Sequence, residues 1–149
     1  MRINTCLMAT VAMLMTVPVY AEKKAINPPE YSAPGAPTLP FSPGILVDGT
    51  LYVAGQIGRN LKSGEIPSNF EDEVRLCLTD IEFVLKAAGM SFKDVVAVQV
   101  YLTDIDLFSR MNAVYGGIFK DPRPARTTVG VSKLAAPNAH IEITVTARK

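Results

Sequence analysis

Two charged residues near the C-terminus stand out because each lies within a strand-like run of residues. Residues 124–131 and 140–147 alternate like half-buried strands, with Arg126 and Glu142 opposite their apolar residues. The connection over 132–139 is short, so we expect the two strands to pair as neighbours and to place both charges on one face. A guanidinium can bind a carboxylate through two hydrogen bonds, and a carboxylate beside it can hold or activate water. The same pattern also fits a plain cross-strand ion pair at the surface.

Few other side chains offer catalytic or metal-binding chemistry. His140 is the only histidine, so a histidine-based triad or a zinc site would lack partners, and we interpret it as an exposed residue at a strand end. The sequence contains no phosphate-binding loop, no dinucleotide fingerprint and no carboxylate cluster suited to calcium. Besides the two charged residues, the remaining polar groups are the turn at Gly55 and the pair Asn112 and Tyr115 on a predicted helix.

These groups together predict a small organic acid as the ligand. Arg126 would bind its carboxylate through a planar pair of hydrogen bonds. Glu142 would then position water against an electrophilic carbon next to that carboxylate. Backbone groups around Gly55 and Thr128 would supply further polar contacts.

The first 21 residues have the pattern of a secretory signal peptide. Arg2 gives the positive start, residues 6–17 are almost unbroken in their apolar character, and Ala21 ends a plausible cleavage site. The apolar run is shorter than the roughly 20 residues that span a bilayer, although an uncleaved N-terminal anchor is the alternative. We therefore expect an exported protein, periplasmic or secreted, that is cleaved after Ala21 and has no stable membrane association afterwards.

Charge and cysteine content narrow the classes of function. The chain has 15 Lys and Arg residues against 14 Asp and Glu residues, and loss of Arg2 with the signal peptide would balance the two. Neutrality argues against a nucleic-acid surface, whose affinity comes mainly from phosphate neutralisation. Cys77 would be the one cysteine of the mature chain, so no internal disulfide is expected. Its place on an apolar helical stripe predicts a small core residue rather than a nucleophile.

The sequence after residue 21 predicts a single α+β domain over residues 41–149. A proline-rich extended segment, residues 22–40, precedes this domain. Asp48 and Gly49 between apolar runs predict a two-residue hairpin turn. We expect strands over 45–47, 50–53, 94–102, 124–131 and 140–147, a helix over 70–88 with a capping box at Ser68, and a helix capped by Thr103 with its stripe between Leu107 and Ile118. This order predicts a single sheet with two helices packed on one face.

The opposite face of that sheet would lack a cover in a monomer. On the strand over 94–102, Val96, Val98 and Val100 are expected to face the core, and Ala97 and Tyr101 the other side. The outward residues are mixed, small and partly apolar, and such a face tends to be covered by another subunit. We therefore expect a homo-oligomer.

Four short blocks resemble the ordered signature of the Rid family of reactive-intermediate deaminases, also called the YjgF family. The blocks are Ala54-Gly55-Gln56-Ile57, Asn112-Ala113-Val114-Tyr115, Pro124-Ala125-Arg126-Thr127 and Ile141-Glu142-Ile143. The resemblance covers the chain from about residue 34 to its end. It implies a chorismate-mutase-like α+β fold with one mixed sheet, assembled as a homotrimer around a central barrel, with a ligand site in each cleft between subunits.

The resemblance also implies an activity. Family members hydrolyse 2-imino acids or their enamines, such as 2-iminopropanoate and 2-iminobutanoate, to 2-oxo acids and ammonia without a metal or organic cofactor. Arg126 matches the arginine that holds the substrate carboxylate, and Glu142 matches the glutamate associated with the water or the imine nitrogen. Main-chain groups at Gly55 and Thr128 would line the cleft, and Asn112 matches the asparagine of the helix motif, with a structural rather than catalytic role.

The sequence departs from the family pattern at several positions near the expected cleft. Phe41 stands where a tyrosine is usual, so a hydroxyl that could contact the ligand is missing. Ala54 stands where serine is common, and Thr144 replaces a second glutamate. These departures keep a second hypothesis open, a non-catalytic trimeric protein that binds small carboxylates or acts in envelope stress. A nuclease, an activity attributed to some relatives, is disfavoured by the neutral charge.

Overall fold

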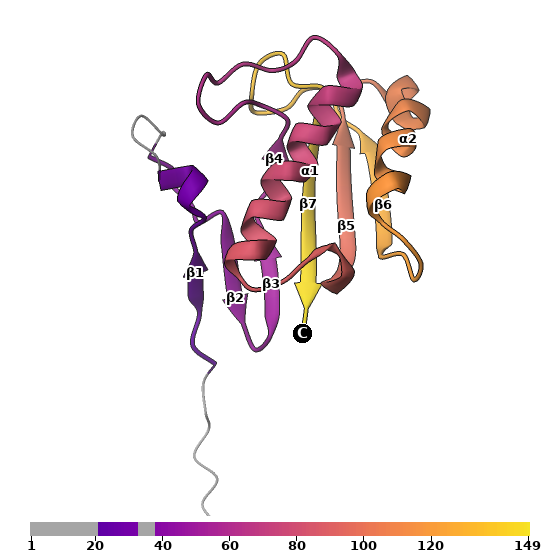
Figure 1. Ribbon diagram of the computed structural model, residues 1–149. Coiled ribbons are helices and arrows are strands. Elements are labelled where there is room, and N and C mark those ends of the chain that lie inside the picture. The colour runs from indigo at the N-terminus through magenta and orange to yellow at the C-terminus, as the bar shows by residue number, and fades with distance from the viewer. Residues whose placement is uncertain (1–20, 33–37) are drawn as a thin grey trace, which may run out of the picture.

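The protein folds into a sheet that carries both α-helices on one side (Figure 1). A computed structural model describes residues 21–32 and 38–149, so the expected signal peptide lies outside the described residues except for Ala21. The elements in chain order are β1 (Lys24–Ile26), a 3-10 turn η1 (Pro29–Ser32), β2 (Gly44–Val47), β3 (Thr50–Val53), β4 (Gln56–Ile57), α1 (Phe70–Ala87), η2 (Phe92–Asp94), β5 (Val95–Leu102), η3 (Ile105–Leu107), α2 (Phe108–Ile118), β6 (Ala125–Gly130) and β7 (Ile141–Arg148).

The strand order is β1-β2-β3-β7-β5-β6, with β4 also paired to β7. Only β5 and β6 run parallel among these pairs, so the sheet is mixed. β7 lies in the middle, between β3 and β5, although it is the last strand in the chain. The expected α+β fold, a chorismate-mutase-like mixed sheet with two helices on one face, is confirmed.

The β2–β3 hairpin forms where the turn residues predict it. Asp48 and Gly49 both have positive φ angles, 48° and 69°, as a tight two-residue turn requires. The register pairs Val47 with Thr50. The side chains of Leu51 and Val53 then point under the helices and are buried.

The predicted extended segment over residues 22–40 holds regular structure of its own. β1 adds to the sheet by pairing with β2, with Ile26 opposite Gly44. In η1, the Tyr31 hydroxyl donates to the Gln56 side-chain oxygen. Burial raises the pKa of this Tyr31 phenol. The described N-terminal segment is therefore bound to the sheet at two points, through β1 and through Tyr31.

Helix α1 buries an apolar stripe against the sheet. Its N-cap is Asn69, whose side chain accepts a hydrogen bond from the backbone N–H of Asp72 at 3.0 Å, so the expected cap at Ser68 is wrong by one residue. The helix stops before Gly89, which has a φ of 70°. Cys77 is fully buried, as predicted for a core residue.

Two details differ from expectation around β5 and α2. Val96 is 50% exposed because a register shift between Val95 and Ala97 turns it away from the core. Thr103 does not cap the second helix, since η3 intervenes and the Asp104 side chain accepts from the Asp106 N–H at 2.9 Å. The spacing signal placed the helix correctly but could not show the extra turn before it.

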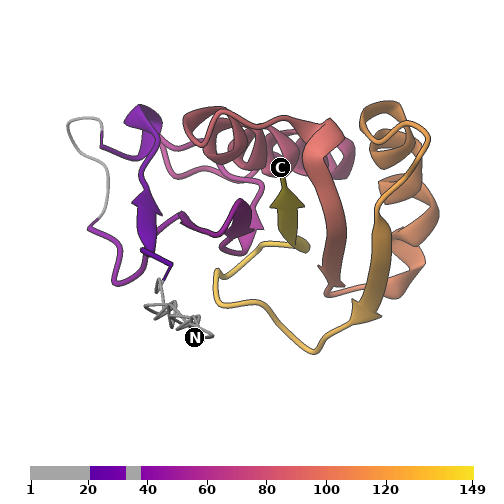
Figure 2. The same cartoon turned by 90° about the horizontal axis from the view of Figure 1, so that it is seen from below.

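Among the described residues, both α-helices lie on one side of the sheet and none lies on the other (Figure 2). Tyr52 and Val129 lie on strands next to residues that face the helices, and both are exposed. The described part of the chain therefore has the open face expected from the sequence. Within residues 21–32 and 38–149, no helix has both the length and the apolar character needed to cross a membrane.

Candidate functional site

Arg126 lies on the edge strand β6 and points under helix α2. Its Cα partner on β5 is the buried Val98, so the Arg126 side chain is on the helix side of the sheet. The guanidinium carbon lies 4.4 Å from the centre of the Tyr115 ring and 5.6 Å from that of Phe108. Nη1 is 3.9 Å from the Met111 sulfur. We call these four side chains the Arg126 cluster.

The Arg126 cluster holds a cation against aromatic faces without a counter-charge. None of the ion pairs of the described residues involves Arg126. A planar guanidinium on an aromatic face keeps its N–H groups free at the edge of its plane. The side chain is therefore available to bind a carboxylate from outside the protomer.

Glu142 lies on the central strand β7 and points to the open face. Its Cα partners are Tyr101 and Ile57. It lines a hollow of 350 Å³, which is formed by Gly55, Tyr101, Val131, Lys133, Leu134, Ala135, Glu142 and Thr144. Burial raises the pKa of the Glu142 carboxyl. A carboxyl of this kind is better suited to exchange protons near neutral pH than an exposed one.

Gly55 leaves the space that the Glu142 carboxylate occupies. A Cβ at position 55 would lie 1.9 Å from Glu142 Oε1 and 2.8 Å from its carboxyl carbon. No side chain fits at that distance without moving the carboxylate. The expected neighbourhood of Gly55 and Glu142 is thus present within one protomer.

The expectation that Arg126 and Glu142 share one face is wrong within a protomer. β5 lies between β6 and β7, so the two strands are not neighbours. Arg126 is level with Val98 and Glu142 with Tyr101, an odd separation that puts them on opposite faces. A surface ion pair between them in one protomer is excluded by the same register.

The whole folded domain matches a known family. The family model described as Endoribonuclease L-PSP matches residues 31–149. The chain is 42% identical over 96 residues to the 2-iminobutanoate/2-iminopropanoate deaminase of Bos taurus, an alignment that covers 64% of this chain and 70% of that protein. It is 34% identical to the solved structure of YyfA from Yersinia pestis, described as a protein of unknown function of the Rid family, with a TM-score of 0.78 and coverage of 86% and 100%. The chain belongs to the Rid family.

A second solved relative is of chemical interest. This Rid family chain is 30% identical to E. coli TdcF, a structure described with bound serine, with a TM-score of 0.70 and coverage of 76% of this chain and 91% of that one. Serine is a small molecule that carries a carboxylate and an amino group.

The other residues predicted from the sequence of this Rid family protein lie either near the Arg126 cluster or near Gly55. Thr128 follows Arg126 by two residues on β6 and is level with Val100, so its side chain faces the helices. Asn112 is partly buried on α2, next to Met111. Phe41 is 54% exposed and lies two residues before Pro43, whose carbonyl accepts from the Ala54 N–H at 2.9 Å.

Two buried acidic side chains, Glu73 and Asp80, were not among the residues predicted from the sequence; Glu73 is the one that contacts the strand carrying Glu142. Its carboxylate is completely buried and accepts from the backbone N–H groups of His140 at 2.7 Å and Ile141 at 3.3 Å. His140 Nδ1 lies 2.9 Å from the second carboxylate oxygen. His140 is half exposed, as expected of a strand end, but it is also fixed to α1. The available signal was the place of Glu73 within the apolar stripe, three residues after Phe70.

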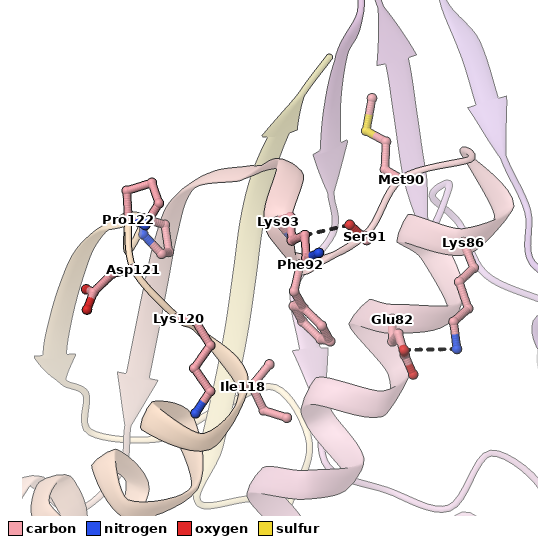
Figure 3. A pocket seen from close by; sticks show the side chains of 11 residues that line it. Glu82, Lys86, Met90, Ser91, Phe92, Lys93, Ile118, Lys120, Asp121 and Pro122 are labelled. Atoms are coloured by element: carbon pink, nitrogen blue, oxygen red, sulfur yellow. Dashed lines mark hydrogen bonds and ion pairs between the residues drawn. The ribbon is translucent and has the colours of Figure 1, made fainter.

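A separate hollow lies elsewhere, between α1, η2 and the connection from α2 to β6 (Figure 3). Its volume is 530 Å³, and its lining includes Phe92, Ile118 and three lysines. Glu82 and Lys86 in its wall are paired at 2.9 Å. It contains neither Arg126 nor Glu142, so it is not part of the candidate site. Within the described ranges no group of histidine, cysteine, aspartate and glutamate side chains is arranged to hold a metal ion.

Proposed function

We propose that this Rid family member hydrolyses small 2-imino acids and their enamines, of the 2-iminopropanoate and 2-iminobutanoate type, to 2-oxo acids and ammonia. The observation that carries the proposal is the Arg126 guanidinium, which lies on an edge strand against aromatic rings with no carboxylate partner among the described residues. A substrate carboxylate is the counter-charge that it lacks. We propose no metal ion or organic cofactor for the reaction.

The proposed chemistry needs one carboxylate that can give and take a proton. Arg126 holds the substrate carboxylate, and Glu142 accepts a proton from water as the water oxygen bonds to the imine carbon. Glu142 passes this proton to the imine nitrogen, so the tetrahedral intermediate carries a hydroxyl and an amino group. Glu142 then takes the hydroxyl proton and delivers it to the amino nitrogen. An oxygen lone pair forms the new carbonyl as the carbon–nitrogen bond breaks and its electrons leave with ammonia. The raised pKa of the Glu142 carboxyl supports this double role.

We further propose that the site forms between two protomers of a homotrimer. Arg126 and Glu142 lie on opposite faces of one sheet, so they can meet only if they come from different copies. The open sheet face, with its exposed Tyr52 and Val96, supplies a surface for such contacts. Each site would then use Arg126 of one protomer and Glu142 of its neighbour.

A coupled assay with two variants tests both proposals. An amino-acid oxidase generates 2-iminobutanoate in situ, and the release of 2-oxobutanoate is followed with and without the mature protein. Arg126→Ala is expected to lose about 2 to 5 kcal/mol of transition-state binding, and Glu142→Gln is expected to lose turnover. When the two variants are co-expressed, about one quarter of the sites would pair an intact Arg126 with an intact Glu142. No recovery in mixed assemblies of proven composition would contradict the shared site.

A binding protein of the same fold is the second candidate. The exposed Phe41 favours it, because this side chain offers no hydroxyl to a ligand near the Gly55 strand. The same assay separates the two candidates. Binding of 2-oxobutanoate that depends on Arg126, without any acceleration of imine hydrolysis, would favour the binding protein.

Nucleic acid is not among the ligands that we propose. The family is described as Endoribonuclease L-PSP, but this chain has nearly equal numbers of acidic and basic residues, and phosphate backbones require a basic surface. Incubation of the mature protein with a labelled single-stranded RNA is expected to leave the RNA intact. Cleavage that Arg126→Ala abolishes would overturn this part of the proposal.

We also propose that the protein acts after export. The pattern of residues 1–21 supports cleavage after Ala21. The first strand begins at Lys24, so removal of these residues leaves every described element in place. N-terminal sequencing of the protein from a periplasmic extract is expected to begin at Glu22, and a chain that retains residue 1 would contradict the proposal.

A further inference from the structure

The Tyr115 ring, which lies beneath Arg126, contacts both the core and the guanidinium. Tyr115 is 6% exposed and lies on α2, facing the sheet. Phe119 stacks on its ring with centroids 4.3 Å apart and planes 29° from parallel. The Arg126 guanidinium carbon lies 4.4 Å from the centre of the same ring. Tyr115 thus links the packed core to the cation of the proposed site.

Aromatic rings make most of the contacts that orient the Arg126 side chain. Within the described part of the chain, its contacts are the rings of Tyr115 and Phe108 and the sulfur of Met111. None of these fixes the guanidinium through a strong hydrogen bond. The ring face attracts the cation and holds it close, so the ring limits where the guanidinium and its N–H groups lie.

Two buried hydroxyl groups beside the guanidinium have no hydrogen-bond partner among the described residues. They are Tyr115 Oη and Thr128 Oγ1. Buried polar groups in folded proteins are nearly always paired, so each exception needs an explanation. Thr128 is two residues from Arg126 on the same face of β6, and both hydroxyls come from residues that flank Arg126.

The donor count of the guanidinium supplies that explanation. Arginine has five N–H groups in a fixed plane, and a carboxylate takes two of them. Three remain and need acceptors when a ligand is bound. Tyr115 Oη and Thr128 Oγ1 are buried hydroxyls without a partner in the described part of the chain, and both belong to residues next to Arg126.

We propose that Tyr115 is a positioning residue of the imine-hydrolysing site: its ring limits where the Arg126 guanidinium lies, and its hydroxyl, with that of Thr128, accepts the remaining N–H groups when a carboxylate is bound. This inference rests on the proposed function. Tyr115 itself contacts no substrate, so its removal acts on carboxylate binding rather than on the chemical step.

The test compares Tyr115→Leu, Tyr115→Phe and Thr128→Val with a control in the same stack, Phe119→Leu. The probe for binding is 2-oxobutanoate, measured by calorimetry, and KM and kcat come from the coupled imine assay. Tyr115→Leu is expected to raise Kd and KM about tenfold while kcat changes less than about threefold. Tyr115→Phe keeps the ring, so it and Thr128→Val are expected to raise both values about threefold.

The control variant separates positioning from packing. Phe119 is 1% exposed and lies on the Tyr115 ring, so Phe119→Leu disturbs the same core without removing the ring beneath Arg126. It is expected to lower stability toward urea while Kd and KM stay within about twofold of those of the wild type. Equal losses of binding in Phe119→Leu and Tyr115→Leu would overturn the inference.

A spectroscopic readout decides the question independently of activity. The Arg126 Nε–H resonance, identified by its loss in Arg126→Lys, is expected to be shifted by the ring current in the wild type. It should move to the position of a free arginine in Tyr115→Leu and stay shifted in Tyr115→Phe and Phe119→Leu. An unshifted wild-type resonance would overturn the inference even if the enzyme is active. A shifted resonance in a protein that neither binds 2-oxobutanoate nor speeds hydrolysis would instead count against the proposed function.

Discussion

Replacing Glu73 tests whether one buried carboxylate holds the last strand to the first helix. The carboxylate is fully buried and accepts from the backbone N–H groups of His140 and Ile141. Glu73→Leu would leave both donors buried without a partner. Each of the two orphaned backbone groups costs about 1 to 3 kcal/mol, and burial of the leucine side chain offsets a small part of that cost, so we expect a loss of about 2 to 5 kcal/mol in the free energy of unfolding.

The measurement is urea denaturation of the mature protein at a single protein concentration, because assembly also contributes to apparent stability. With a slope of about 2 kcal/mol per molar urea, the expected loss moves the midpoint by about 1 to 2.5 M. Glu73→Gln keeps one acceptor oxygen and should lose about half as much.

Asp72→Ala is the matched control on the same helix turn. Asp72 pairs with Arg75 at 2.6 Å, but both side chains are about 60% exposed. Exposed pairs at this spacing contribute about 0.5 kcal/mol or less. If Glu73→Leu and Asp72→Ala shift the midpoint equally, the reasoning from the buried backbone donors is refuted.

Two further predictions concern the open face and the pH dependence of stability. Gly55→Ala places a Cβ where the Glu142 carboxylate lies. We therefore expect a loss of about 100-fold in kcat/KM in the imine assay, with little change in the urea midpoint. The control is Gly116→Ala, where a Cβ meets nothing within 4 Å, and it should leave activity unchanged. Burial raises the pKa of Asp80 from 3.8 to about 7. Between these pH values the native state keeps a proton on Asp80 that the unfolded state has lost. The free energy of unfolding therefore falls as the pH rises from about 4 to 7, by at most about 4 kcal/mol. Asp80→Asn should flatten this fall in urea titrations at several pH values, and an unchanged slope would count against the raised pKa.

The local elements could be predicted because short-range chemistry determines them. The Asp48–Gly49 turn needs positive φ angles at both positions, and the apolar spacing of α1 leaves one face for the sheet. The cap of α1 was misplaced by one residue because Ser68 and Asn69 can both accept a helix N–H. Propensity does not distinguish two adjacent capping side chains.

The arrangement of the site could not be predicted because it depends on strand order. The short connection from 131 to 140 favours direct pairing of the Arg126 and Glu142 strands, and neighbours in sequence usually are neighbours in the sheet. Here β5, made earlier, lies between them. Because β5 lies between β6 and β7, its pairing register with each of them determines which face Arg126 and Glu142 occupy. The sequence names the individual residues as candidates, while their grouping requires the three-dimensional structure.

The central place of β7 means that the sheet cannot close until the final residues have been synthesised. The β1–β2–β3 portion and the β5–β6 portion are joined only through the strand Ile141–Arg148. A nascent chain therefore holds two incomplete halves until its last stretch leaves the ribosome. Truncation before Ile141 would remove the strand that joins the two portions of the sheet.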